Sequence, residues 1–345
     1  MRPVSLGVFG ATGQVGGVML RILEERGFPV ATLRLFASER SAGSAVSVFG
    51  HDVVVEDIEV ADFSGLEIAL FACGAPASRR FAPLVAASGA VVIDNSAAWR
   101  MDPEVPLVVT EANARDLDNI PKGIVGNPNC TTMVAIPVLK PLHDLAGLRR
   151  VVVATYQAAS GAGRAGTSAL DEEAQKAASS AARLAFGGDA VSYPESDVFP
   201  GPLAFNVLPE AGSYVEDGSG ETTEEQKYRN ECRKILGLPE LAVSCTCVRV
   251  PVFTGHSAAL NLEFEKKVSV KEAADVLARA PGVELSQLPT PLAVAGRDVS
   301  LVGRIREDAT VPDSRGLSLF VVGDNLRKGA ALNAVQIAEI LSSHM

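Results

Sequence analysis

The feature that most constrains the fold is a glycine-rich turn close to the start of the chain. A short apolar run, residues 4–10, ends in Gly10, and Gly13 and Gly16 follow at three-residue spacing. The segment from Val15 to Glu25 then carries apolar residues at helical spacing. A strand, a glycine turn and a helix in this order are typical of a parallel α/β sheet whose first helix N-terminus binds a pyrophosphate. A tight turn without a ligand is the alternative, because the spacing departs from Gly-x-Gly-x-x-Gly.

The rest of the first half repeats this alternation of short strands and helices. The pattern predicts an α/β domain at residues 1–127, a Rossmann-like dinucleotide-binding domain whose parallel sheet is joined by right-handed crossovers. The other elements expected in it are strands at Leu33–Ala37, Ile68–Ala72, Ala90–Ile93 and Gly123–Gly126 and a helix at Ala77–Ser88.

The character of the sequence changes after residue 127. Strands and helices now mix without regular alternation, which predicts a second domain of the α+β class at residues 128–325. A last helix is expected from about Leu326 to Ser342, where apolar residues recur at helical spacing. The other expected elements are strands at Val151–Gln157, Cys245–Phe253, Ala258–Phe264 and Leu317–Val322 and helices at Gly166–Phe186 and Val270–Ala280.

The residues after the second strand indicate which dinucleotide the turn binds. NAD sites usually place a carboxylate there to bind the ribose 2′-hydroxyl. In this chain Ser38, Arg40 and Ser41 offer hydroxyl groups and a guanidinium, which suit the 2′-phosphate of NADP. Glu39 would restore selectivity for NAD if it faced inward, and an exposed polar loop without a ligand is the other interpretation.

The segment around Cys130 predicts a reactive thiol. Pro128 ends an extended run, and apolar residues recur at helical spacing from Thr131 onward, so Cys130 is expected in the first turn of a helix. The N–H groups and dipole of a helix N-terminus favour the thiolate. Asn129 is placed to donate a hydrogen bond to a developing oxyanion. The alternative is an inert buried cysteine, which is the interpretation for Cys73, Cys232, Cys245 and Cys247.

A cysteine nucleophile needs a group that exchanges protons with it, and His256 is the candidate. It follows Gly255, which permits a close approach of neighbouring backbone, whereas a lone histidine of this kind is otherwise structural. Arg249 lies between Val248 and Val250 in a strand-like run. A guanidinium in such apolar surroundings needs an anion as its partner.

Composition excludes several classes of protein. A formal net charge of −10 and a single tryptophan argue against nucleic acid or an anionic membrane surface as partner. No apolar run approaches the roughly 20 residues of a membrane span, and the start of the chain lacks a signal-peptide core. The odd number of scattered cysteines, five, fits a reducing cytoplasm. No metal site is expected, because the spacing of Cys245 and Cys247 is wrong for zinc.

Taken together, these segments resemble the aspartate-β-semialdehyde dehydrogenase family, bacterial type. The resemblance covers nearly the whole chain, and the order and spacing of the matching pieces are much more specific than any one of them. The matching pieces lie at residues 10–16, 37–43, 94–100, 127–132, 156–163, 205–209, 224–227, 249–256 and 323–329.

The resemblance implies a role for each matching site residue. In catalysis it implies Cys130 as nucleophile, His256 as general acid and base, and Gln157 as the residue that orients the substrate near the thioester, with Asn129 beside them. The implied substrate contacts are Arg249 to the α-carboxylate, Glu224 to the ammonium group, and Arg100 and Lys227 to the phosphate. The implied NADP contacts are Thr12, Gly13, Gln14, Val15, Arg40, Ser41, Ser160, Gly161 and Asn325, to which the glycine turn and the loop after the second strand add Gly10 and Ser38.

The resemblance also implies a reaction, the NADPH-dependent reductive dephosphorylation of 4-phospho-L-aspartate to aspartate semialdehyde in the biosynthesis of lysine, threonine and methionine. It further implies a homodimer assembled through the second domain and a last helix that completes the first domain. One alternative is a reductase of N-acetyl-γ-glutamyl phosphate, but that substrate has no free ammonium group for Glu224. An alternative of another class is a non-catalytic NADP-binding sensor, which would need neither Cys130 nor Arg249.

Overall fold

The computed structural model describes residues 1–344, which divide into two compact units. Unit 1 comprises Met1–Lys140, Asn230–Glu240 and the chain from Leu326 onward, and unit 2 comprises Pro141–Arg229 and Leu241–Asn325. The boundary predicted near residue 127 precedes helix α4 (Cys130–Ala146), and the compact units divide within that helix instead. Helix α6 (Thr223–Leu236) is likewise shared between the two units.

Unit 1 is built on a seven-stranded sheet with the order β3-β4-β2-β1-β5-β6-β7. Neighbouring strands are parallel, except that β3 and β4 form an antiparallel pair. The strand order runs in opposite directions on the two sides of β1, which confirms the predicted dinucleotide-binding architecture. The strands are β1 (Val4–Phe9), β2 (Val30–Ala37), β3 (Ala45–Val48), β4 (His51–Asp57), β5 (Ile68–Phe71), β6 (Val91–Asp94) and β7 (Ile124–Gly126).

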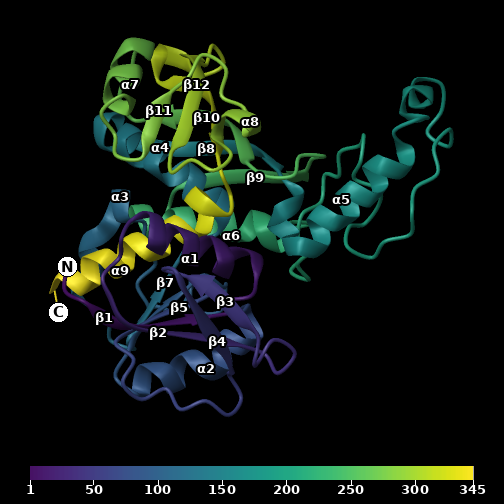
Figure 1. Ribbon diagram of the computed structural model, residues 1–345. Coiled ribbons are helices and arrows are strands. Elements are labelled where there is room, and N and C mark those ends of the chain that lie inside the picture. Colours follow the sequence, from purple (N-terminus) through teal and green to yellow (C-terminus); the bar gives the residue numbers. More distant parts are fainter. Residues whose placement is uncertain (345) are drawn as a thin grey trace. The chain divides into compact units, whose positions relative to one another are not determined.

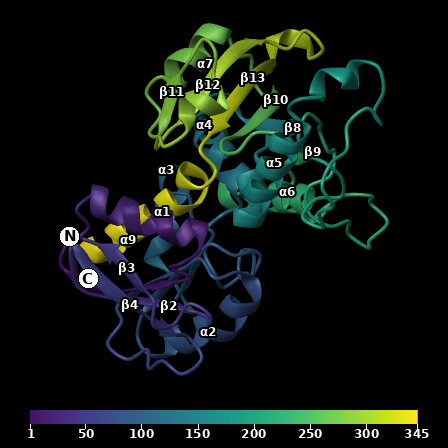
Figure 2. The same ribbon diagram turned by 45° about the vertical axis from the view of Figure 1, so that its right-hand side comes forward.

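Helices cover both faces of this sheet, as Figures 1 and 2 show. Helices α1 (Gln14–Glu25) and α9 (Leu332–His344) pack on one face, and α2 (Ala75–Ala87) packs on the other. On the α2 face the parallel register aligns Phe9 with Phe36 and with Phe71, and their rings stack at centroid distances of 4.3 and 4.2 Å. The short helices α3 (Thr110–Asn113) and η1 (Ala114–Asp118) lie before β7.

Unit 2 is built on a mixed six-stranded sheet with the order β11-β12-β13-β10-β8-β9, which confirms the predicted α+β class. Strands β8 and β9 are parallel and β10 is antiparallel to β8, so β8 and β9 end at the edge where β10 begins. The strands are β8 (Leu148–Gln157), β9 (Ala242–Arg249), β10 (His256–Phe264), β11 (Val283–Leu285), β12 (Ser300–Glu307) and β13 (Gly316–Gly323). The helices are η2 (Ala159–Ala162), α5 (Gly163–Ala177), η3 (Ala181–Ala185), the first part of α6, α7 (Val270–Leu277), α8 (Pro291–Val294) and η4 (Pro312–Ser314).

Two helices differ from the sequence-based expectation. The helix predicted over Gly166–Phe186 ends at Ala177, because Ser180 leaves the helical conformation and its hydroxyl bonds to the Ala177 carbonyl. The helix predicted from Leu326 begins instead with a π-helical turn, η5 (Arg327–Ala331), before α9. Among residues 1–344, no helix combines the length and the apolar character needed to cross a membrane.

Candidate active site

The glycine turn after β1 has glycine where side chains cannot fit. Gly10 has a φ of +80°, and a Cβ atom there would lie 2.6 Å from the Ala72 carbonyl oxygen. A Cβ atom at Gly16 would lie 2.2 Å from the carbonyl oxygen of Gly10. Gly13 is the exposed N-cap of α1 and provides no side-chain cap, and the first turn of α1 contains no acidic residue. A helix N-terminus of this kind attracts an anion.

The neighbouring residues also fit a bound dinucleotide. The side-chain oxygen of Gln14 is buried without a hydrogen-bond partner, and such a group is able to accept a hydrogen bond from a ligand. The Thr12 hydroxyl donates to Ser41 over 3.3 Å and so joins the glycine turn to the loop after β2. In that loop Ser38, Glu39 and Arg40 are all exposed. Val15, also predicted as a cofactor contact, packs against the core between α1 and the sheet.

Cys130 is the first residue of α4 and is half-buried. The preceding residue, Asn129, caps this helix: its side-chain oxygen accepts hydrogen bonds from the Thr131 amide at 3.0 Å and from the Thr131 hydroxyl at 2.6 Å. The sequence therefore folds locally so that the thiol lies at a capped helix N-terminus. The amide oxygen is an acceptor, so any contact of the Asn129 side chain with an oxyanion has to come from its NH₂ group, which takes no part in the cap.

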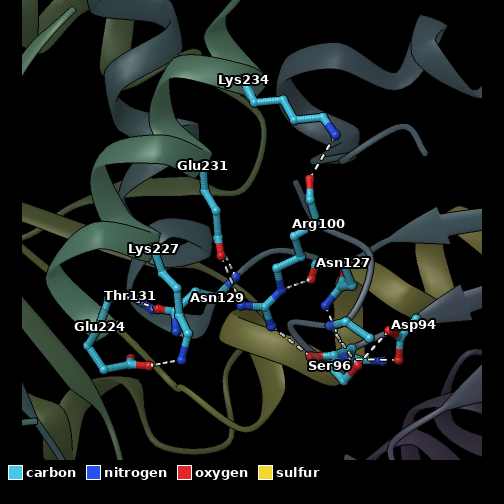
Figure 3. A network of polar contacts seen from close by, with 12 residues as sticks. Asp94, Ser96, Arg100, Asn127, Asn129, Thr131, Glu224, Lys227, Glu231 and Lys234 are labelled. Carbon is cyan, nitrogen blue, oxygen red and sulfur yellow. Dashed lines mark hydrogen bonds and ion pairs between the residues drawn. The ribbon is translucent and has the colours of Figure 1, made fainter. Parts of the chain in front are cut away.

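Arg100 lies in the same unit and is held by three acceptors, as Figure 3 shows. Its Nε donates to the Asn127 carbonyl at 2.9 Å, its Nη1 to Glu231 at 2.9 Å, and its Nη2 to the Asn95 carbonyl at 2.7 Å. The other carboxylate oxygen of Glu231 accepts the backbone N–H of Asn129 at 2.6 Å. Sequence reasoning missed Glu231, although it lies two helical turns beyond Glu224 on the same face of α6.

The segment at the end of the chain completes the surroundings of Cys130. In η5, a Cβ atom at Gly329 would lie 3.1 Å from the Cβ atom of Cys130, so glycine at this position permits close packing against the nucleophile. The side-chain amide of Asn127 donates to the Ala330 carbonyl at 3.1 Å and to Asn95 at 2.7 Å. The π-helical turn is thus packed against residues 127–130, the nucleophile loop, within unit 1.

Unit 2 brings three of the predicted catalytic and binding residues to one sheet edge. Gln157 ends β8 and pairs in register with Arg249 at the end of β9, and His256 begins β10. The peptide groups of Ala158 serve two of them: its N–H donates to His256 Nδ1 at 3.0 Å, and its carbonyl accepts Arg249 Nη1 at 2.9 Å. A Cβ atom at Gly161 would lie 2.7 Å from Arg249 Nη1 and 3.2 Å from His256 Nε2.

His256 is held in a neutral form. Burial, and to a smaller extent the charge of Arg249, lower the pKa of His256 to about 3, while Glu224 acts in the opposite direction. The hydrogen bond from Ala158 requires a lone pair on Nδ1, so the neutral ring carries its proton on Nε2.

The remaining predicted residues of unit 2 form two further contacts. Asn325 is buried, and its side-chain oxygen accepts the N–H of Gly255 at 2.9 Å while its amide group bonds with Ser160, which fixes the loop before His256. Lys227 donates to Glu224 at 2.6 Å, so the groups predicted to bind the phosphate and the ammonium group are paired with each other. The described residues 1–344 contain no cluster of three or more potential metal ligands.

Two models of known families match the chain. Residues 5–120 match the model for the NAD binding domain of semialdehyde dehydrogenases, and residues 139–328 match the model for their dimerisation domain. Aspartate-semialdehyde dehydrogenase of Streptomyces akiyoshiensis is 58% identical over 99% of both chains, and that of Mycolicibacterium smegmatis is 55% identical over 99% of this chain and 100% of its own. The chain belongs to the aspartate-semialdehyde dehydrogenase family.

Solved structures of the aspartate-semialdehyde dehydrogenase family show the same fold. Aspartate semialdehyde dehydrogenase II from Vibrio cholerae is 40% identical, with a TM-score of 0.91 over 99% of both chains. A structure of that protein in complex with ASA has a TM-score of 0.90 and 41% identity, again over 99% of both chains. The NADP complex of the Candida albicans protein shares the fold, with a TM-score of 0.74 at 23% identity, covering 99% of this chain and 100% of that one.

Proposed function

We propose that the chain catalyses the NADPH-dependent reductive dephosphorylation of 4-phospho-L-aspartate to L-aspartate 4-semialdehyde, a step in the biosynthesis of lysine, threonine and methionine. The observation that carries the proposal is the position of Cys130 at the capped N-terminus of α4. Membership of the family, the names of the relatives and the ASA complex of the Vibrio cholerae protein support the substrate.

The proposed chemistry begins with the Cys130 thiolate, which the helix dipole and N–H groups stabilise. Its sulfur attacks the carbonyl carbon of the acyl phosphate, the bond from that carbon to the phosphate oxygen breaks, and inorganic phosphate leaves. A thioester on Cys130 remains. NADPH, when bound, supplies the hydride that reduces the thioester carbonyl. The carbon–sulfur bond then breaks, which releases the aldehyde and returns the thiolate.

We assign to His256 the hydrogen bond to the reacting oxygen or sulfur. Its Nε2–H is the donor, because Nδ1 accepts the Ala158 N–H, and a general acid and base role requires the ring to exchange its second proton through Nδ1. Gln157, whose side-chain oxygen accepts the Thr155 hydroxyl at 3.1 Å, orients the substrate beside the thioester, and the Asn129 NH₂ group donates to the oxyanion.

The proposed substrate contacts pair each charge of the substrate with an opposite charge. Arg249, a residue that is only 8% exposed, binds the α-carboxylate where burial strengthens a charge-assisted pair. Glu224 binds the ammonium group, and Arg100 and Lys227 bind the phosphate. Lys227 and Glu224 pair with each other at 2.6 Å, so the groups proposed for the phosphate and the ammonium group lie side by side.

The chain contains the NAD-binding domain of its family, and we propose NADP as the dinucleotide. The uncapped start of α1 suits the pyrophosphate, and the partnerless oxygen of Gln14 suits a ligand beside it. Ser38, Arg40 and Ser41 would hold the 2′-phosphate. Ser160, Gly161 and Asn325 would line the nicotinamide end, with Asn325 fixing Ser160.

The test is phosphate-dependent reduction of NADP by L-aspartate semialdehyde, measured for the wild type and for Cys130→Ala. Activity that requires phosphate and disappears in Cys130→Ala is the expected result. If the wild type instead turns over N-acetyl-glutamate semialdehyde alone, the covalent chemistry holds and the substrate is wrong. Inactivity with both aldehydes would favour the non-catalytic NADP-binding protein.

We further propose a cytoplasmic homodimer. The match of residues 139–328 to a dimerisation domain supports the dimer. Light scattering coupled to size-exclusion chromatography should give twice the mass of one chain, 36.0 kDa, and a mass of one chain would contradict the proposal.

A further inference from the structure

The carboxylate of Glu231 is one of the most deeply buried charged groups in unit 1. Glu231 is 1% exposed and Arg100 is 6% exposed, so their ion pair is shielded from water. A buried carboxylate is costly unless its oxygens are satisfied. Here each oxygen has its own donor: one accepts Arg100 Nη1 at 2.9 Å, and the other accepts the backbone N–H of Asn129 at 2.6 Å.

One of these donors belongs to the proposed phosphate-binding group and the other to the residue before the nucleophile. Arg100 is the proposed phosphate-binding group, and Asn129 is the N-cap residue immediately before Cys130. Arg100 also donates through Nε to the Asn127 carbonyl at 2.9 Å. Arg100 therefore bonds to Asn127 and Glu231 bonds to Asn129, the residues that flank Pro128 in the sequence (Figure 3).

The same face of α6 carries a second support for Arg100. Lys234 lies one helical turn after Glu231, and its Nζ donates to the carbonyl oxygens of Arg100, Asp102 and Val105 at 2.7, 2.7 and 2.9 Å. Burial lowers the pKa of Lys234, which is consistent with an ammonium group enclosed by these carbonyls. The end of α6 thus fixes the backbone of Arg100 through Lys234 and its side chain through Glu231.

We propose that Glu231 is a positioning residue, which sets the Arg100 guanidinium relative to the Cys130 thiolate. The inference rests on the proposed function, in which Arg100 binds the phosphate while Cys130 attacks the adjoining carbonyl carbon. The leaving phosphate and the attacking sulfur are bound to the same carbon, so both groups must be placed together. Because the Glu231 carboxylate bonds to both Arg100 and the Asn129 N–H, it fixes the distance between the guanidinium and the start of α4.

The sharpest variant is Glu231→Gln, which keeps the shape of the side chain. A carboxylate accepts at both oxygens, whereas the amide offers one oxygen and one NH₂ group. One of the two donors, Arg100 Nη1 or the Asn129 N–H, then faces another donor and has to move. We expect the KM for inorganic phosphate, measured in the direction of aldehyde oxidation, to rise and kcat to fall, each by about 10-fold or more.

Two further variants keep the experiment informative. Glu231→Asp retains the negative charge beside Arg100 but shortens the reach, so a folded protein with a smaller loss in the same direction is expected. Glu173 provides the matched control: it is also 1% exposed, and one of its oxygens accepts the N–H groups of Leu203 and Ala204. Glu173→Gln should lower stability and leave the phosphate KM unchanged.

A double-variant cycle separates positioning from general support of the fold. If Glu231 acts through Arg100, then Glu231→Gln should change the phosphate KM much less in an Arg100→Lys background than in the wild type. Equal effects in the two backgrounds, or a wild-type phosphate KM in Glu231→Gln, would overturn the inference about Glu231. Wild-type protein that is inactive with aspartate semialdehyde and phosphate would overturn the proposed function itself.

Discussion

A single residue, Ala158, determines the chemistry of two side chains at the edge of the unit 2 sheet. The N–H of Ala158 fixes the tautomer of His256, and its carbonyl oxygen holds one arm of Arg249. Two groups of like charge would repel each other at this spacing, so the protein keeps one of them neutral. The neutral histidine is therefore a structural consequence of its neighbours, and it can be tested by titration.

The stability of the protein should depend on pH through His256. The pKa of His256 is about 3 in the folded chain and about 6.5 in an unfolded one, so below about pH 6.5 the unfolded chain binds a proton that the folded chain does not. This contribution to the free energy of unfolding is fully present above that pH and decreases as the pH falls. Between pH 7 and about pH 5, the free energy of unfolding of the wild type should fall by about 2 kcal/mol more than that of His256→Gln, as measured by urea unfolding. An equal loss in both proteins would show that His256 does not titrate in this way.

Gly161 should be essential for activity because its missing side chain leaves room for two functional groups. In Gly161→Ala the new Cβ atom would meet Arg249 Nη1 at 2.7 Å and His256 Nε2 at 3.2 Å, and both side chains have to shift. We expect kcat/KM to fall by roughly 100-fold without loss of the fold. Gly188→Ala is the control, since a Cβ atom there meets nothing within 4 Å. Matching kinetics of the two variants would refute the packing argument.

Arg40 should determine the preference between the two dinucleotides. An exposed guanidinium that binds a 2′-phosphate contributes to NADP binding and not to NAD binding, because NAD lacks that group. Arg40→Ala should raise the KM for NADP by about 10-fold and leave that for NAD unchanged. Glu39→Ala, at the neighbouring position, is the companion variant, and it should not raise the KM for NADP. Equal weakening of both dinucleotides in Arg40→Ala would remove the 2′-phosphate assignment.

At the scale of secondary structure, the sequence predicted those helices and strands whose formation depends on residues within one short segment. The strand, glycine turn and helix from Val4 to Glu25 and the helix start at Cys130 follow from propensity, capping and close approach within a short segment. The hairpin of β3 and β4 was missed, because its strands are half exposed and mix polar with apolar residues. Strand β12 has the same character in its second half.

In the candidate site too, the sequence did not predict features that depend on contacts between distant parts of the chain. Cys130, Arg100, Arg249 and His256 stand in recognisable segments, whereas the role of Glu231 depends on Asn129, which is 102 residues away in the sequence. The π-helical turn was likewise not predictable from the periodicity of its own residues. Its extra residue per turn is associated with contacts to Cys130 and Asn127 that only the folded unit provides.

The π-helical turn should be anchored by a buried ion pair. Lys328 in η5 is 0% exposed, and its ammonium group pairs with Glu111, the second residue of α3. Removal of one partner leaves the other charge buried and unpaired, so Glu111→Ala should lower the free energy of unfolding by about 3 to 5 kcal/mol. Urea unfolding measures this. The double variant Lys328→Met/Glu111→Leu should recover part of the lost free energy of unfolding. If the effects of the two single variants simply add in the double variant, the two side chains do not stabilise the fold as an ion pair.

At the scale of the whole molecule, each unit is assembled from segments that are distant in the sequence. Unit 1 takes its sheet from the first part of the chain, a short stretch of α6 from the middle, and η5 and α9 from the end. Helix α9 packs beside α1 on the sheet (Figure 2), with Val335, Ile337 and Leu341 in the same apolar cluster as Leu6 and Val8 of β1.

This arrangement has a consequence for the protein as it is being synthesised. Domains of many proteins fold on the ribosome as soon as they emerge, beginning at the N-terminus. Here α1 covers only part of one face of the sheet, and α9 completes the cover from the end of the chain. The nascent chain therefore exposes part of an apolar sheet face until α9 has left the ribosome, and a prematurely terminated chain should be a substrate for chaperones and proteases and never an active enzyme.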